Sequence, residues 1–288
     1  MTPRSLCRRA LPSVLVAVAA AHPAAAQYTA RADVMMGGRH VWHGLSRAGG
    51  MVLQPSIGLG IRSGQWSANG GLVRHYEMDR VVSGELSQTG AGGGRLGEDD
   101  LWARTTLDLR EMQVSVGVAR YVFRGRASAG GMGPDRNTTE IFGSLAPKDL
   151  YLNPSLEAWV DVGRVRGVYF RAATQMPVLA YPLQPFVFVY LETELGLNVG
   201  QGPNPSRPLE LANFAKRGIT HAGFGATVER RQGHWPGVGL WLLSAGARLQ
   251  LNFDEATRLN GESRSADFSV WLWAGTTVVL GRDARDVS

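Results

Sequence analysis

Over most of its length the chain alternates apolar and polar side chains in segments of about ten residues. The clearest segment, 185–199, places Leu191 and Leu195 on one parity, and Glu192 and Glu194 on the other. Successive side chains of a strand point to opposite faces, so such a segment has one apolar and one polar wall. The pattern predicts two-faced β-strands.

Twelve segments read as strands of this kind, separated by turns rich in Gly, Asp and Arg. The sequence therefore predicts an all-β fold built from about twelve antiparallel strands. The strands are expected over 29–44, 51–62, 66–77, 100–110, 112–124, 138–146, 154–163, 167–177, 185–199, 217–230, 238–253 and 266–281.

The lengths of the connections distinguish a membrane barrel from a soluble sandwich, the main structural alternative. The shortest turns, near 63–64 and 110–111, follow even-numbered strands, and the long links follow odd-numbered ones. Exceptions are the links 44–51, 163–167 and 178–184. Short periplasmic turns and long external loops are typical of transmembrane up-and-down β-barrels, and an even strand count places both termini in the periplasm. The long links are 78–99, 125–137, 200–216 and 254–265.

The N-terminal segment has the features of a secretory signal. Arg4, Arg8 and Arg9 precede an apolar run over 11–21, and Ala24-Ala25-Ala26 offers an A-x-A cleavage site. We therefore expect residues 1–26 to be a signal peptide. Residues 27–288 are expected to form one outer-membrane barrel domain ending in a polar tail, 283–288.

Composition fits an exported barrel of the bacterial outer membrane. The mean hydropathy of −0.10 is low because only alternate residues would face lipid. The net charge of +6 loses three arginines with the signal, and so modest a charge does not indicate a nucleic-acid partner. The expected partners are outer-membrane lipid, the barrel-assembly machinery and small solutes. The single cysteine, Cys7, lies in the signal, so no disulfide is expected.

The segment 39–69 resembles the start of the TorF-type outer-membrane porin family. The resemblance rests on Arg-His-Val-Trp-His-Gly-Leu-Ser-Arg at 39–47, Leu-Gln-Pro-Ser-Ile-Gly at 53–58 and Ser-Gly-Gln-Trp-Ser-Ala-Asn at 63–69. It covers about the first two hairpins and implies a barrel with a pore, but no assigned substrate. Such barrels often end on an aromatic residue, whereas the last strand here runs to Leu280-Gly281.

Charged residues of both signs fall on the polar parity, which suits a water-filled lumen because an unpaired charge in a dry interior is costly. The sequence therefore favours a passive channel for small solutes. A non-conducting structural barrel and a rim enzyme are the alternatives. No aromatic ladder that would favour sugars is evident. The residues expected to line the lumen are Arg62, Arg104, Asp108, Glu157, Asp161, Arg171, Glu192, Glu194 and Arg248.

A hairpin around 180–181 would set Arg171 opposite residue 190, within diagonal reach of Glu192. We therefore expect Arg171 to neutralise Glu192 and leave Glu194 free to attract cations. On the same polar parity, Asn198 is expected to tolerate Arg.

Other chemistry is weakly indicated. His40 and His43 are three residues apart, so on one strand they would face opposite ways and could not chelate one ion. The G-x-G-x-x-G match at 92–97 lies in a polar loop rather than at the start of a helix. His75, beside Glu77, is the most plausible catalytic base, but no serine motif accompanies it. Neither a catalytic site, a cofactor nor a metal is expected.

Overall fold

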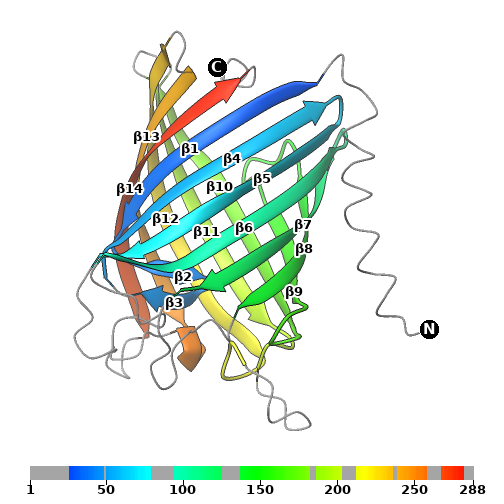
Figure 1. Cartoon of the computed structure of the whole chain (residues 1–288), viewed down its shortest axis with the longest axis vertical. Helices are drawn as coiled ribbons and strands as arrows, with labels where there is room; N and C mark the ends of the chain where they lie inside the picture. The colour runs from blue at the N-terminus through cyan, green and yellow to red at the C-terminus, as the bar shows by residue number, and fades with distance from the viewer. Residues whose placement is uncertain are drawn as a thin grey trace.

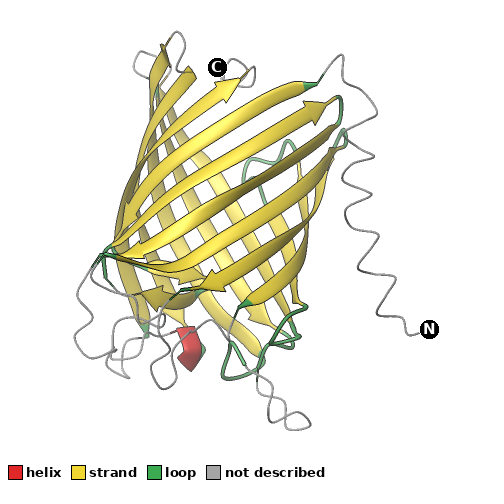
Figure 2. Cartoon of the chain, viewed as in Figure 1, coloured by secondary structure: helices red, strands yellow, loops and turns green. Residues whose placement is uncertain are grey.

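The computed structural model describes residues 26–48, 50–78, 94–124, 137–181, 186–202, 212–235, 239–257 and 267–281. Twelve antiparallel strands close into a barrel (Figures 1 and 2), as the sequence predicts. The predicted signal, apart from Ala26, and the polar tail lie outside the described residues. The barrel strands are β1 (Gln27–Gly37), β4 (Val52–Ser63), β5 (Trp66–Glu77), β6 (Arg95–Asp108), β7 (Met112–Phe123), β8 (Thr138–Pro147), β9 (Ser155–Asp161), β10 (Val168–Tyr181), β11 (Val187–Asn198), β12 (Gly218–Trp235), β13 (Gly239–Asn252) and β14 (Phe268–Gly281).

Each barrel strand from β4 to β14 pairs with its sequence neighbours, and β1 closes the ring. On one side β1 pairs with β4, and on the other with β14, where Thr29 lies opposite Gly281. The start of β1 and the end of β14 therefore lie at the same end of the barrel, which we call the terminal end. The opposite end, with the longest gaps between strands, is the loop end (Figure 1).

The outward face of the barrel is apolar. Ile57 and Leu59 on β4 are 63% and 72% exposed, and Val270 and Leu272 on β14 are 59% and 68% exposed. In water such a band would be an aggregation-prone surface, whereas in a bilayer it is the lipid-facing girdle. The closed ring leaves no free strand edge, and such closure is required in a membrane interior because unpaired backbone groups cannot bond to water there. The predicted transmembrane barrel is confirmed, and the soluble sandwich is excluded.

No helix in the described part of the chain is long and apolar enough to cross a membrane. The one short helical turn described in Figure 2, the 3-10 helix η2 (Glu255–Thr257), follows β13 at the loop end.

The prediction of a first strand over 29–44 is wrong in its second half. The strand β1 ends at Gly37, and the chain then forms a small hairpin of β2 (His40–Trp42) and β3 (Leu45–Ala48). His43 and Gly44 form its turn, both with positive φ. All four residues of β3 are buried, whereas barrel strands show alternating exposure, so the hairpin lies inside the barrel near the loop end (Figure 1). We call residues 40–48 the lumen hairpin.

Candidate functional site

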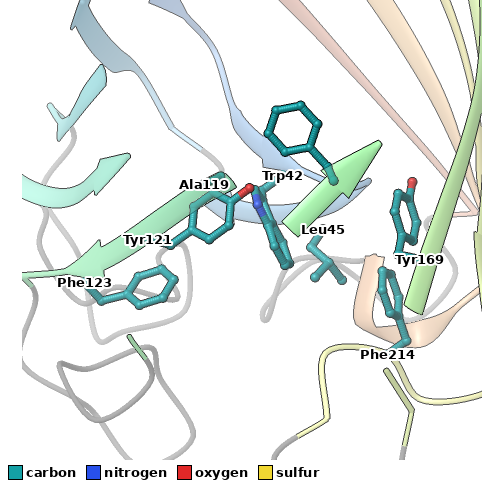
Figure 3. Packing of buried hydrophobic residues seen from close by; sticks show 8 residues of the cluster. Trp42, Leu45, Ala119, Tyr121, Phe123, Tyr169 and Phe214 are labelled. Atoms are coloured by element: carbon teal, nitrogen blue, oxygen red, sulfur yellow. The ribbon is translucent and has the colours of Figure 1, made fainter. Parts of the chain in front are cut away.

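The lumen hairpin is anchored to one side of the barrel wall by aromatic contacts. The indole of Trp42 meets the ring of Tyr121 on β7 edge-on, with centroids 5.2 Å apart. The Arg47 guanidinium lies 4.3 Å from the Trp42 ring centroid and 4.9 Å from that of Phe123, also on β7. Figure 3 shows Trp42 and Leu45 between these rings and those of Tyr169 and Phe214. This aromatic cluster fixes the hairpin relative to the wall.

The tip of the hairpin reaches other parts of the wall. Nε2 of His43 donates to Glu140 on β8 at 2.9 Å, and its ring centroid lies 4.5 Å from that of Tyr169 on β10. The carbonyl of Gly44 accepts a hydrogen bond of 2.7 Å from Gln250 on β13. Contacts with strands from β7 to β13 mean that the hairpin crosses the lumen.

The first strand of the hairpin packs against β5 and β6. The His40 imidazole stacks on that of His75, with centroids 3.9 Å apart and planes 13° from parallel. The amide of Gln54 donates to Nδ1 of His75 at 2.7 Å, and Nε2 of His75 donates to Asp100 at 2.9 Å. Burial, together with the nearby His75 and Arg47, lowers the pKa of His40 well below its ordinary value. His40 is therefore neutral at neutral pH.

A cavity of about 550 Å³ lies beside the hairpin, lined by residues from around the barrel. It exposes charged and aromatic side chains side by side. Five of the nine residues expected to line the lumen border it: Glu157, Arg171, Glu192, Glu194 and Arg248.

The charges on the cavity wall form a connected network centred on Glu194. Arg171 Nε donates to its carboxylate at 2.9 Å, and Arg248 Nη2 lies 2.6 Å from the same oxygen. The ring of His221 lies 3.2 Å from the other oxygen, and Arg171 also reaches Glu157 at 3.4 Å. These pairs compensate charges that would otherwise be costly in a half-buried setting.

The expected pairing of Arg171 with Glu192 is wrong. Arg171 lies opposite Gly196, because the β10–β11 hairpin turns later than residues 180–181 and β10 contains an irregularity next to Pro177. Glu192 instead accepts hydrogen bonds from Gln175 at 3.2 Å and Thr227 at 3.1 Å. Glu194, not Glu192, is the carboxylate that Arg171 neutralises.

The other four expected lumen residues are dispersed. Arg62 pairs with Asp108 at 3.1 Å near the terminal end, and the Arg104 guanidinium lies 5.1 Å from the Phe142 ring centroid. Asp161 is buried at the loop end, where it accepts from the Thr138 hydroxyl at 2.7 Å and from backbone N–H groups of residues 163, 165 and 166. Asp161 orders the β9–β10 connection.

Asn198 is not the tolerant position that its parity suggested. It is 1% exposed, its amide nitrogen donates to the Lys216 carbonyl at 2.6 Å, and its oxygen accepts from the Gln201 N–H at 2.7 Å. An arginine there would break both bonds, so facing away from lipid is not sufficient for tolerance.

The aromatic lining of the cavity is missed by the sequence reading. The signal was present on β14, where Trp271 and Trp273 share one parity and the outward Val270 and Leu272 share the other. Tryptophan in such barrels is most often found in belts at the membrane surface, so its position alone does not indicate a cavity wall. The cavity-lining aromatic residues are Trp42, Trp102, Tyr121, Trp159, Tyr169, Trp271 and Trp273.

His75 has different neighbours from those expected of a catalytic base. Its two ring nitrogens bond Gln54 and Asp100, so neither is bonded to a serine nucleophile. The G-x-G-x-x-G match continues from residue 95 into strand β6; Gly94 and Gly97 of the motif are described, and Gly92 lies outside the described residues.

No protein-family profile matches the chain, and no curated protein matches it. The TorF-type resemblance is therefore not confirmed by sequence comparison. Among solved structures, an outer-membrane channel of Pseudomonas putida F1 aligns over 89% of this chain and 95% of its own, with 11% identity and a TM-score of 0.47. The KdgM porin aligns over 87% and 98%, with 7% identity and a TM-score of 0.41.

The translocator domain of the autotransporter NalP from Neisseria meningitidis also aligns, over 93% of this chain and 94% of its own, with 11% identity and a TM-score of 0.37. Similarities this distant do not indicate which solute, if any, passes through this barrel. The closed ring and apolar outer surface of the chain itself define its class, a transmembrane β-barrel of the outer-membrane type.

Proposed function

We propose that the protein is an outer-membrane channel for small solutes, with the lumen hairpin narrowing its external mouth. The observation that carries the proposal is the cavity of about 550 Å³ beside the hairpin, walled by charged side chains. Charges such as Glu192 and Arg248 favour a wall in contact with water over a dry core. A wet cavity beside a segment that narrows the lumen is what a restricted channel needs.

The orientation follows from the connections. Outer-membrane barrels carry short turns on the periplasmic side and longer loops outside, so the terminal end is periplasmic and the loop end external. The lumen hairpin then lies near the cell exterior. An incoming solute meets the hairpin first, and the ion-paired cavity wall next to it.

The cavity lining narrows the class of solute. Aromatic faces such as Trp271 and Trp273, together with carboxylate and guanidinium groups, suit polar organic molecules with an apolar face. We place lipid and the barrel-assembly machinery among the partners because every barrel of this class needs them. Membership of the TorF-type family stays a proposal that rests on the segment 39–69.

The non-conducting structural barrel is the second candidate, and a specific observation favours it. The hairpin contacts the wall on opposite sides, through His40 at β5, Trp42 at β7 and Gly44 at β13. If those contacts never open, the barrel conducts nothing.

The two candidates are separated by planar-bilayer recording on refolded protein. Wild type is compared with a variant in which residues 39–49 are removed and Gly38 is joined to Gly50. A channel gives small or intermittent currents in wild type and larger, steady currents in the variant. Currents in the variant alone would support the structural barrel, and no current in either, from protein shown to be folded, would reject the channel.

A further inference from the structure

We propose that His40, His75 and Asp100, with Glu98 beside them, form a binding site for a divalent transition metal of the zinc type, which ties the lumen hairpin to the barrel wall. One ligand atom from each of His40, His75 and Asp100 lies within 4.8 Å of the others. The three residues come from β2, β5 and β6. An ion bound here would cross-link the hairpin to two wall strands.

An unpartnered polar atom and two buried carboxyl groups lie at the same place. Nδ1 of His40 is buried and has no hydrogen-bond partner among the described residues. The buried carboxyl groups of Glu98 and Asp100 are in hydrogen-bond contact with each other, and Asp100 also accepts from His75. His40 Nδ1 lies 3.6 Å from Glu98, beyond hydrogen-bond range. Buried polar atoms normally find partners, so an unpartnered imidazole nitrogen next to two buried carboxyl groups is a place where a cation would be stabilised.

The buried carboxylates around the cluster also favour binding of a cation. Glu98 and Glu140 are both 0% exposed, and Glu98 and Asp99 directly precede Asp100 on β6. Against these carboxylates Arg47 brings one buried positive charge. A divalent ion would offset the negative charge that the single Arg47 guanidinium leaves uncompensated.

The types of ligand atom in the cluster indicate which metal ion it would bind. Two imidazole nitrogens with carboxylate oxygens suit Zn²⁺, Ni²⁺ or Cu²⁺ rather than Mg²⁺ or Ca²⁺, which take oxygen ligands. Tetrahedral zinc with bonds of about 2.1 Å holds its ligand atoms about 3.4 Å apart. The widest separation of 4.8 Å in the cluster must therefore shrink by about 1.4 Å.

Binding also requires one ring to turn. The His40 and His75 rings are stacked, and parallel rings cannot direct in-plane lone pairs at one point. His40, His75 and Asp100 all border the cavity, which gives an ion access and gives the rings space. Gln54 already bonds Nδ1 of His75. After its amide flips, it would accept from that nitrogen and leave Nε2 for the metal, the usual outer-shell arrangement.

The test uses the refolded mature barrel in detergent. Zn²⁺ affinity is measured by calorimetry for wild type, His40→Gln, His75→Gln, Asp100→Asn and the control His43→Gln. His43 is on the same hairpin but bonds Glu140. Each cluster variant should lose at least about tenfold in affinity, and His43→Gln should match wild type. Mg²⁺ should not bind.

Electron paramagnetic resonance of the Cu²⁺ form counts the ligating nitrogens directly. Wild type and His43→Gln should show two imidazole nitrogens, and His40→Gln and His75→Gln one each. Equal affinities and equal nitrogen counts in all variants, or no Zn²⁺ binding at all, would overturn the site. Heat-modifiable migration on a gel confirms that each variant is folded, and the conservative Asp100→Asn tests the site again if a histidine variant fails to fold.

One consequence rests on the proposed channel function. A metal that ties β2 to the wall should reduce current through wild type, but not through the variant lacking residues 39–49. Zinc binding with no current in any protein would keep the metal site and reject the channel, so the two proposals fail separately.

Discussion

The clearest quantitative prediction compares an arginine on each face of the barrel at one depth. Leu191 on β11 is 41% exposed on the outward face, and Gln175 on β10 points inward to Glu192. Leu191 lies opposite Met176, the next residue after Gln175. Leu191→Arg and Gln175→Arg therefore place the same charge at nearly the same depth on opposite faces.

The depth of Leu191 follows from strand geometry. Each residue of a tilted barrel strand advances about 2.5 Å along the axis, from a rise of about 3.3 Å and a tilt of about 40°. Leu191 is four residues from Val187 and seven from Asn198, the ends of β11. It therefore lies about 10 Å and about 18 Å from those ends, within the apolar band of about 25 Å.

An arginine near the midplane of the lipid face costs about 2–4 kcal/mol. We therefore expect Leu191→Arg to lower the free energy of unfolding by about 3 kcal/mol, about a hundredfold in the folding equilibrium. Gln175→Arg gains a carboxylate partner in Glu192, and we expect a change below about 1 kcal/mol. The assay is guanidinium unfolding in lipid vesicles, followed by tryptophan fluorescence. Equal losses would show that the assigned faces are wrong, and no loss for Leu191→Arg would show that this face does not meet lipid.

Three further predictions test the barrel, its charge network and its hairpin. Unboiled protein should migrate differently from boiled protein on a gel, because every strand of a closed barrel is paired, and identical migration would contradict closure. Glu194→Gln should destabilise the fold by about 3–5 kcal/mol, because it removes the carboxylate that pairs with Arg248 and leaves Arg171 with only its longer contact to Glu157. Glu192→Gln should cost under about 1 kcal/mol, because Gln175 and Thr227 are neutral donors and the new amide still offers one acceptor oxygen. Similar unfolding midpoints for the two variants would refute the network. Gly44→Ala should displace the hairpin and raise the channel current, because the new Cβ would collide with the His221 ring at a residue whose φ is 79°. The control Gly64→Ala, also at positive φ but with nothing within 4 Å of the new Cβ, should leave the current unchanged. Unchanged current in both variants would contradict a hairpin that narrows the external mouth of the barrel.

The strands and their faces could be predicted from the sequence because every strand of a membrane barrel alternates lipid-facing apolar residues with lumen-facing polar ones. Polar parity on β11, for example, correctly separates Leu191 from Glu192. The register between β10 and β11 could not be predicted, because it depends on where the hairpin turns and on an irregularity beside Pro177. The observed register differs from the predicted one by six residues, so Arg171 lies opposite Gly196 instead of residue 190.

The lumen hairpin was not predicted from the sequence, and the reason is physical. Alternation within 29–44 looks like a continued strand, but residues after Gly37 pack on long-range partners that no local pattern reveals. His40 and His43 were compared only with each other. The fold instead brings His40 to His75, and His43 to Glu140 on a strand almost a hundred residues away.

The position of the lumen hairpin in the chain has a consequence for the order of folding. The hairpin follows the first strand, yet it is held by Tyr121, Glu140, Tyr169 and Gln250, which come much later in the sequence. The ring itself grows through neighbouring hairpins, and the pairing of β1 with β14 joins its two ends. The segment therefore cannot dock until most of the wall exists, so it is among the last parts to order although it lies near the start of the chain.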